Sequence, residues 1–107
     1  MNDSDKRQLL SMLALARKAG RLAAGEESCL KAIRDGSAFI VFLAADASDN
    51  TRKKFKDKAA FYNANILSLF TKDDIGINVG LYDRAALAVT DESFANKMNQ
   101  IITRSNI

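Results

Sequence analysis

The sequence predicts an α/β protein, a three-layer α/β/α sandwich whose central sheet has about four strands. Apolar residues at helical spacing alternate along the chain with short apolar runs, the pattern of helices and strands that follow one another. Two of the runs, residues 38–44 and 85–89, contain no polar residue, which is typical of strands covered on both faces. No linker or internal repeat interrupts the alternation, so we expect residues 1–107 to form a single domain.

The first third of the chain predicts a helix, a short strand and a second helix. The first helix starts near residue 4 or 5, runs to residue 19 and stops at Gly20. A strand over residues 22–24 follows, and the second helix occupies residues 26–35 and stops at Gly36. The apolar stripes of the two helices are Leu9, Leu10, Met12, Leu13 and Ala16, and Cys29, Leu30, Ala32 and Ile33.

The rest of the chain continues the alternation. Thr71 with Asp74 three residues later resembles a capping box, and Gly80 stops the short helix that it opens. Thr90 or Asp91 caps the last helix. The expected strands are residues 38–44, 66–70 and 85–89, and a further helix spans residues 51–62. The buried positions expected in the two longer helices are Phe55, Ala59 and Tyr62, and Phe94, Met98, Ile101 and Ile102.

The composition of the chain indicates its cellular compartment and the kind of partner it binds. With 16 basic and 13 acidic residues the chain has a net charge of +3, which is compatible with a nucleic-acid partner. The single cysteine excludes an internal disulfide and fits a reducing compartment, so we expect a cytoplasmic protein. No apolar stretch approaches the ~20 residues that span a bilayer, and no membrane partner is expected.

The residues needed for common catalytic sites are missing. The chain has no histidine and one cysteine, which leaves no zinc site and no thiol–imidazole pair. Neither a phosphate-binding loop of P-loop type nor a dinucleotide-binding glycine motif is present. The adjacent acids at 26–27 and 73–74 point apart on a helix and do not form a catalytic pair. We therefore expect no enzyme, no catalytic residue, no metal site and no cofactor.

The stretch around Gly25 is the first candidate for a binding site. A glycine at a helix start lets the backbone turn sharply and come close to a ligand. The first N–H groups of the helix carry the positive end of its dipole, which suits a phosphate or the edge of a base. The alternative is a plain turn at Gly25, with Glu26 and Glu27 as acids that compensate the dipole. The cluster of cations over residues 52–58 is likewise either a solvated face or a phosphate-contacting one.

Three strings of the sequence, taken in order, resemble a known family. They are LSMLALARKAGRLAAGEESCLKAIRDG, FIVFLAADAS and IGINVGLYDRAALAVTD, which together cover most of the chain. The chain resembles the ribosomal-protein family of the L7Ae and L30e type, and within it a small bacterial branch. The resemblance implies an L30e-like sandwich that binds structured RNA, above all the kink-turn, a bent duplex with tandem sheared G·A pairs.

The family's contact motif can be carried over residue by residue. It begins with a glycine, here Gly25, and a variable residue, here Glu26. Glu27 then replaces an asparagine or lysine, and Ser28 replaces a glutamate or glutamine, while Lys31 matches the lysine three positions on. An ionised Glu27 only accepts hydrogen bonds, whereas asparagine or lysine donates to the acceptor edge of guanine.

A second contact region of the family is the loop before its last strand, here Leu81, Tyr82, Asp83 and Arg84. Apolar and aromatic side chains there can pack on an unstacked base, and Arg84 can reach a phosphate. The turn over residues 45–50, which contains Asp46, should lie near Gly25 at the same end of the sheet. The backbone contacts expected after this turn are those of Arg52, Lys53 and Lys54.

The resulting expectation is a non-catalytic, ribosomal-protein-like RNA-binding protein that recognises a kink-turn or a similar internal loop. Structured RNA, including ribosomal RNA, is the expected partner, with ribosomal or other proteins as further candidates and no DNA. The alternative is a protein-interaction adaptor on the same fold that has lost kink-turn binding, a reading that the acidic pair Glu26–Glu27 favours. An enzyme with a phosphate-containing ligand at Gly25 ranks last.

Overall fold

Five helices and four strands alternate along residues 1–105, the part of the chain that the computed structural model describes. The structure confirms the predicted α/β alternation in the predicted order. The helices are α1 (Asp3–Lys18), α2 (Glu26–Arg34), α3 (Asp49–Tyr62), α4 (Lys72–Val79) and α5 (Glu92–Arg104). The strands are β1 (Leu22–Ala24), β2 (Ile40–Leu43), β3 (Ile66–Leu67) and β4 (Ala86–Val89).

The sheet places its last strand in the interior. The strand order is β1-β4-β2-β3, so β4 separates β1 from β2. β4 is antiparallel to both neighbours, with Leu87 opposite Ala24 on one side and opposite Phe42 on the other. β2 and β3 are parallel, as expected for strands that are joined through a helix. Every residue of β2 and β4 is buried, which explains why both runs lack polar residues.

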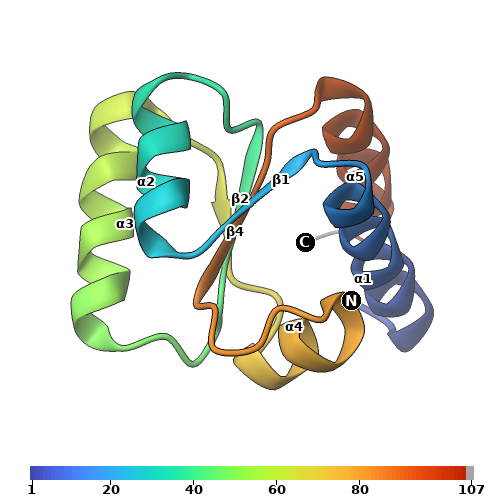
Figure 1. Ribbon diagram of the computed structural model, residues 1–107. Helices are drawn as coiled ribbons and strands as arrows, with labels where there is room; N and C mark the ends of the chain where they lie inside the picture. Colours follow the sequence, from blue (N-terminus) through green and yellow to red (C-terminus); the bar gives the residue numbers. More distant parts are fainter. Residues whose placement is uncertain (106–107) are drawn as a thin grey trace.

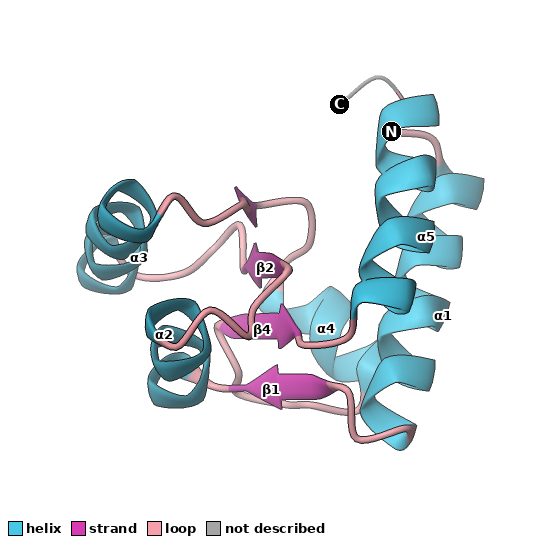
Figure 2. Cartoon of the chain, turned by 90° about the horizontal axis from the view of Figure 1, so that it is seen from above, coloured by secondary structure: helices cyan, strands magenta, loops and turns pink. Residues whose placement is uncertain are grey.

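Helices cover the sheet on both faces. Figure 1 shows α2 and α3 side by side on one face and α1 and α5 on the other, with α4 below them; Figure 2 shows the same three layers from above. The largest fully buried side chains come from all three layers, so one continuous core joins them. They are Phe42, Phe55, Phe70, Leu9, Leu13, Ile40, Ile75, Leu87, Met98, Val41, Val89 and Cys29.

Two expectations for the middle of the chain were wrong in part. The predicted strand 66–70 pairs only over Ile66–Leu67, although Phe70 is buried and its ring lies 5.6 Å from that of Phe42. The backbone leaves the ladder but still accepts a hydrogen bond at Phe70 from the Ala45 N–H. In α3, Tyr62, in the last turn, is 37% exposed instead of buried, and Ala59 is half-buried. Phe70 is therefore buried without being part of a strand, and Tyr62 belongs to the predicted helix without being buried.

The helix ends follow the predicted caps. The Thr71 and Asp74 side chains form the capping box of α4, and Gly80 ends that helix in the left-handed conformation. Asp91 caps α5. The Arg17 guanidinium of α1 donates to the Val79 carbonyl at 3.1 Å and so caps α4 from another helix.

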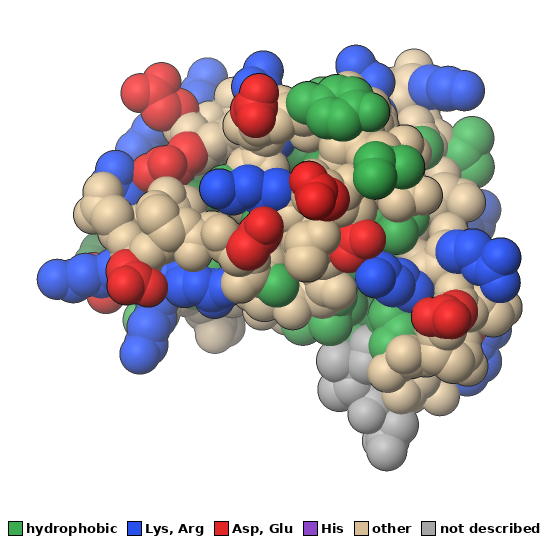
Figure 3. All heavy atoms as spheres, turned by 90° about the horizontal axis from the view of Figure 1, so that it is seen from below, with side chains coloured by type: hydrophobic (Ala, Val, Ile, Leu, Met, Phe, Trp, Pro, Cys, Tyr) green, Lys and Arg blue, Asp and Glu red, His purple; other side chains and the backbone are tan. Residues whose placement is uncertain are grey.

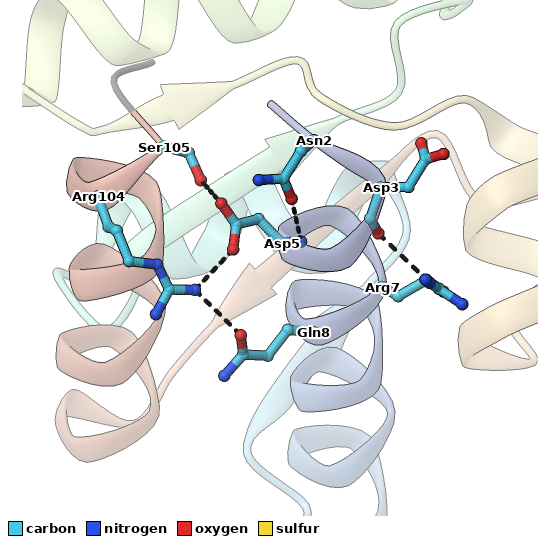
Figure 4. Close-up of polar contacts among 7 residues, drawn as sticks. All are labelled: Asn2, Asp3, Asp5, Arg7, Gln8, Arg104 and Ser105. Carbon is cyan, nitrogen blue, oxygen red and sulfur yellow. Dashed lines mark hydrogen bonds and ion pairs between the residues drawn. The ribbon is translucent and has the colours of Figure 1, made fainter.

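The two ends of the described chain are joined by one carboxylate. Asp5 of α1 accepts hydrogen bonds from the Arg104 guanidinium, at 2.6 Å, and from the Ser105 hydroxyl (Figure 4). Arg104 also donates to the Gln8 side chain at 3.1 Å. The hydrogen bonds from Ser105 and Arg104 hold the pKa of Asp5 below its usual value. Asp5 therefore fastens the start of α1 to the end of α5.

We predict that Asp5→Asn lowers the thermal stability at neutral pH and that its effect fades in acid. Because the folded-state pKa lies below the ordinary value of 3.8, the carboxylate stabilises the fold above about pH 4, and this contribution is lost as the pH falls through the folded-state pKa. Melting temperatures measured between about pH 7 and pH 3 should show the gap between wild type and variant closing. Asp3→Asn, an exposed neighbour in the same turn, is the matched control, and a gap independent of pH would contradict the prediction.

Candidate functional site

Three segments that are distant in sequence meet at one end of the sheet. The Gly25 N–H donates to the Ala86 carbonyl at 2.9 Å, and the Ala44 N–H donates to the Ala85 carbonyl at 2.7 Å. The end of β1, the end of β2 and the start of β4 are thereby fixed side by side. The turn over residues 45–50 thus begins at the same end of the sheet as Gly25, as expected from the sequence, with β4 between the two.

A hollow of about 320 Å³ opens at this end of the sheet. One wall is the start of α2, from Gly25 to Ser28, and the other is the loop that enters β4, including Asp83 and Arg84. Both contact regions that the family resemblance implied therefore border the same hollow. Its complete lining is Ala24, Gly25, Glu26, Glu27, Ser28, Asp83, Arg84 and Ala85.

The helix start in this hollow differs from the other helix starts of residues 1–105. Those are capped by the side chains of Asn2, Ser48, Thr71 and Asp91. At α2 the N-cap is Gly25, which has no side chain to accept a hydrogen bond from the helix. The first intrahelical bond joins the Cys29 N–H to the Gly25 carbonyl, so the N–H groups of residues 26–28 precede it. This positive helix end can receive an acceptor from a ligand.

Glycine is required at position 25 by the backbone. Gly25 has φ 96° and ψ 162°, a region that is essentially restricted to glycine. The stem of Arg84 lies across it, with its Cδ 3.6 Å from where a Cβ of residue 25 would stand. The guanidinium side chain of Arg84 is thereby placed at the mouth of the hollow, beside the helix start.

The two acids that open α2 have different surroundings. The Glu26 carboxylate lies 2.9 Å from the Lys54 ammonium and accepts a hydrogen bond from the Thr51 hydroxyl at 3.3 Å. The hydrogen bond from Lys54 lowers the pKa of Glu26, so this carboxylate stays ionised and neutralised by α3. Glu27 is exposed and makes no ion pair within residues 1–105. Only one unneutralised carboxylate therefore remains at the start of α2.

The cations predicted to contact a ligand backbone also differ from one another. Lys54 is paired with Glu26, and the Arg52 guanidinium donates to the carbonyls of Ala45 and Ala47, which fixes the turn before α3. Lys53 is exposed and has no ion-pair partner within the described chain. Arg52 and Lys54 are therefore engaged in holding the site together, a role that charge counting in the sequence did not show.

Two further predicted residues lie at the edges of the site. Asp46 is exposed, and its carboxylate accepts a hydrogen bond from the Lys72 N–H at 2.9 Å, which ties the turn after β2 to the start of α4. Lys31 is exposed one turn along α2 from Glu27 and does not line the hollow. Neither residue lines the hollow: Asp46 holds the start of α4 from the turn after β2, and Lys31 lies on the exposed surface of α2.

The Tyr82 ring packs against Gly76, a glycine that the sequence analysis did not select as a site residue. The Tyr82 ring is 65% exposed, and a Cβ on Gly76 would stand 2.7 Å from a carbon of that ring. The ring therefore lies on α4 where the helix has no side chain, while Leu81 packs half-buried against the core. A glycine inside a helical pattern was the available signal, since such a residue often marks a close contact.

The remaining candidates for chemistry are structural. Cys29 is buried, and burial raises the pKa of its thiol to about 12, so the thiol stays neutral and inert at physiological pH. Within residues 1–105 no group of three histidine, cysteine, aspartate or glutamate side chains could hold a metal ion. Over the same residues, none of the helices has the length and apolar character to cross a bilayer.

The charges on this end of the molecule are mixed. Figure 3 looks onto it from below and shows Asp and Glu side chains among Lys and Arg side chains over the centre, while Lys and Arg project along the edge where α3 lies. A ligand at the hollow therefore meets a short-range pattern of donors and acceptors, and the denser positive charge lies to one side of it.

Comparisons with known proteins agree with this fold and its elements. The family model of the ribosomal protein L7Ae/L30e/S12e/Gadd45 family matches residues 7–99. A protein of Enterococcus faecium called RNA-binding protein YlxQ is 37% identical over 95% of this chain and 98% of its own length. A protein of the same name from Bacillus subtilis is 36% identical over 85% of this chain and 91% of its own.

Two solved structures share the fold. A protein of unknown function from Bacillus halodurans superposes with a TM-score of 0.81 at 33% identity, over 89% of this chain and 96% of its own. The Giardia lamblia 15.5kD RNA binding protein superposes with a TM-score of 0.78 over 97% of this chain and 89% of its own, at 17% identity, which shows a common fold.

These matches confirm the resemblance read from the sequence, and the names they carry are those of ribosomal and RNA-binding proteins, not of enzymes, as we expected for this chain. The matched residues run from within α1 to within α5 and include every residue that lines the hollow. The chain belongs to the ribosomal protein L7Ae/L30e/S12e/Gadd45 family.

Proposed function

We propose that this chain is a non-catalytic RNA-binding protein that recognises a kink-turn or a similar internal loop, as a single domain in the cytoplasm. The observation that carries the proposal is the uncapped start of α2, which faces a hollow bordered by Arg84. Its N–H groups suit phosphate or base acceptors, and the hollow admits a splayed nucleotide. The names of the two curated relatives support RNA as the ligand.

Each site residue has a role in this proposal. The backbone of residues 25–28 meets base edges and phosphate, and Arg84 pairs with a phosphate across the hollow. Lys31 neutralises a phosphate farther along the same strand, and Tyr82 covers an unstacked base. Asp46, in the turn after β2, and Lys53, in the first turns of α3, border the bound RNA, while Arg52 and Lys54 hold that turn and α2 in place. Ribosomal RNA is one source of such an internal loop.

The protein adaptor is the second candidate function, and exposed apolar residues favour it. Ile77 of α4 is 72% exposed and directly follows Gly76, on which the 65% exposed Tyr82 ring packs. Together with the mixed charges of this face, such side chains suit a protein partner, and a ribosomal protein is one candidate. If the protein is an adaptor, Ile77→Ser removes a protein interaction and leaves the affinity for RNA unchanged. If it binds RNA, the Lys31 and Tyr82 variants described next lose affinity for RNA.

We expect tighter binding to a kink-turn RNA than to a plain duplex of equal length, measured in a salt titration. Lys31→Ala should weaken kink-turn binding and reduce the slope of log K against log salt by about 1, because one phosphate contact is lost. Glu27→Asn should strengthen binding, since it removes a charge that repels phosphate and adds a donor for guanine.

Lys97→Ala, an exposed lysine on α5, is the matched control for Lys31→Ala. The proposal is wrong if the wild type does not distinguish the two RNAs, and a distinction gained only in Glu27→Asn would show an intact scaffold whose target is not the kink-turn. If Lys31→Ala and Lys97→Ala lower the affinity equally, Lys31 makes no specific contact and the proposed site is wrong.

A second prediction concerns the contact between the Tyr82 ring and Gly76. Gly76→Ala should leave the protein folded, because alanine favours the helix by about 1 kcal/mol over glycine and the exposed ring can swing away. It should nevertheless weaken kink-turn binding in the same direction as Tyr82→Ala, since stacking on a base is worth roughly 1–3 kcal/mol. Thermal unfolding checks the first expectation and RNA titration the second. Full affinity in both variants would show that Tyr82 covers no base.

A further inference from the structure

The outer surface of α3 carries lysines that the proposed site does not use. Lys53, Lys56 and Lys58 make no ion pair within residues 1–105, in contrast to Lys54. Asp57 is the one acid among residues 50–62 of this helix. Because like charges this close repel one another, the surface gains free energy when an anion binds.

Two aromatic rings stand at the far end of the same helix. Phe61 is 80% exposed, the highest value among the exposed large apolar residues, and Tyr62 is 37% exposed. Their ring centroids are 4.8 Å apart at an interplanar angle of 67°, and the helix ends directly after them at Asn63. The buried residues of α3 are Thr51 and Phe55, so the fold does not depend on the Phe61 ring. A mostly exposed aromatic pair is available for contact with a partner.

This surface continues directly from the candidate site. The Lys54–Glu26 ion pair joins α3 to the start of α2, and the two helices lie side by side in Figure 1. Lys54, Lys58 and Phe61 follow one another at i, i+4 and i+7, which places them along one flank of the helix. At 1.5 Å per residue the 14 residues of α3 extend about 20 Å away from the hollow.

We propose that this surface, Lys53, Lys58, Phe61 and Tyr62, binds unpaired nucleotides that flank the structured RNA. The inference rests on the RNA-binding function proposed above. Lysines contact phosphates of any sequence, and exposed aromatic rings stack on bases that no duplex encloses. A duplex flank would offer phosphates to the lysines but no base to the two rings. The α3 surface thus selects RNAs in which a single strand leaves the structured loop.

The test compares a kink-turn RNA with the same RNA carrying a single-stranded extension of about eight uridines at its 5′ or 3′ end. The wild type should bind one of the extended RNAs more tightly than the unextended one. Phe61→Ala should remove that gain, lowering the affinity for the extended RNA about fivefold or more, with the unextended RNA unaffected. Lys58→Ala should reduce the salt slope for the extended RNA by about 0.7, the value for one phosphate of a single strand.

Matched variants separate this surface from general effects. Leu15→Ala removes an exposed apolar side chain, 56% exposed, from α1 on the opposite layer, and Lys97→Ala removes an exposed lysine from α5. Neither should alter the gain from the extension. Asp57→Asn should increase it, because the one acid of this surface is neutralised. Thermal unfolding of each variant confirms that the fold is retained.

The outcomes distinguish the two proposals. Binding of the kink-turn RNA with no gain from either extension would overturn the α3 inference and leave the proposed function standing. The same holds if Phe61→Ala behaves like Leu15→Ala. Failure of the wild type to bind the kink-turn RNA at all would overturn both.

Discussion

The pairing of β4 on both of its edges is the constraint on which the site depends. β4 is antiparallel to β1 and β2, and its buried side chains fix the register, since a slip by one residue would turn the apolar set toward the wrong face. The hydrogen bonds of Ala85 and Ala86 then place the loop before β4 against Gly25. For this reason Arg84 lies beside the start of α2, while the Tyr82 ring, two residues earlier, packs on Gly76 of α4.

Most of the fold could be predicted because local chemistry and long-range packing agree. Unbroken apolar runs marked β2 and β4, and caps and glycines marked helix ends within a few residues. The strand order could not be obtained from the pattern, since nothing local to residues 86–89 shows that they lie between β1 and β2. Phe70 shows the same limit on a smaller scale, because its apolar side chain indicates burial and says nothing about which backbone groups pair.

The sequence predicted which positions form the candidate site better than it predicted which of their charges are neutralised. Gly25 was a candidate from its place at a helix start and Arg84 from the family resemblance, and the structure places both at one hollow. The state of Glu26 was not predictable, because its neutralising partner Lys54 lies 28 residues away in sequence. The sequence shows two adjacent acids at the start of α2, of which the structure leaves only Glu27 without an ion pair within residues 1–105. Residue type fixes a charge, and only tertiary structure decides what that charge faces.

The position of β4 also determines when the chain can fold during its synthesis. Translation delivers β1, β2 and β3 first, yet β1 has no partner among them, and the edge of β2 that β4 will occupy stays open. The start of α1 likewise waits for Arg104, 99 residues later. A nascent chain halted before residue 86 therefore exposes unpaired strand edges, which are templates for aggregation. The complete sheet can form only after residues 86–89 have left the ribosome, so β1 stays unpaired until most of the described chain has been synthesised.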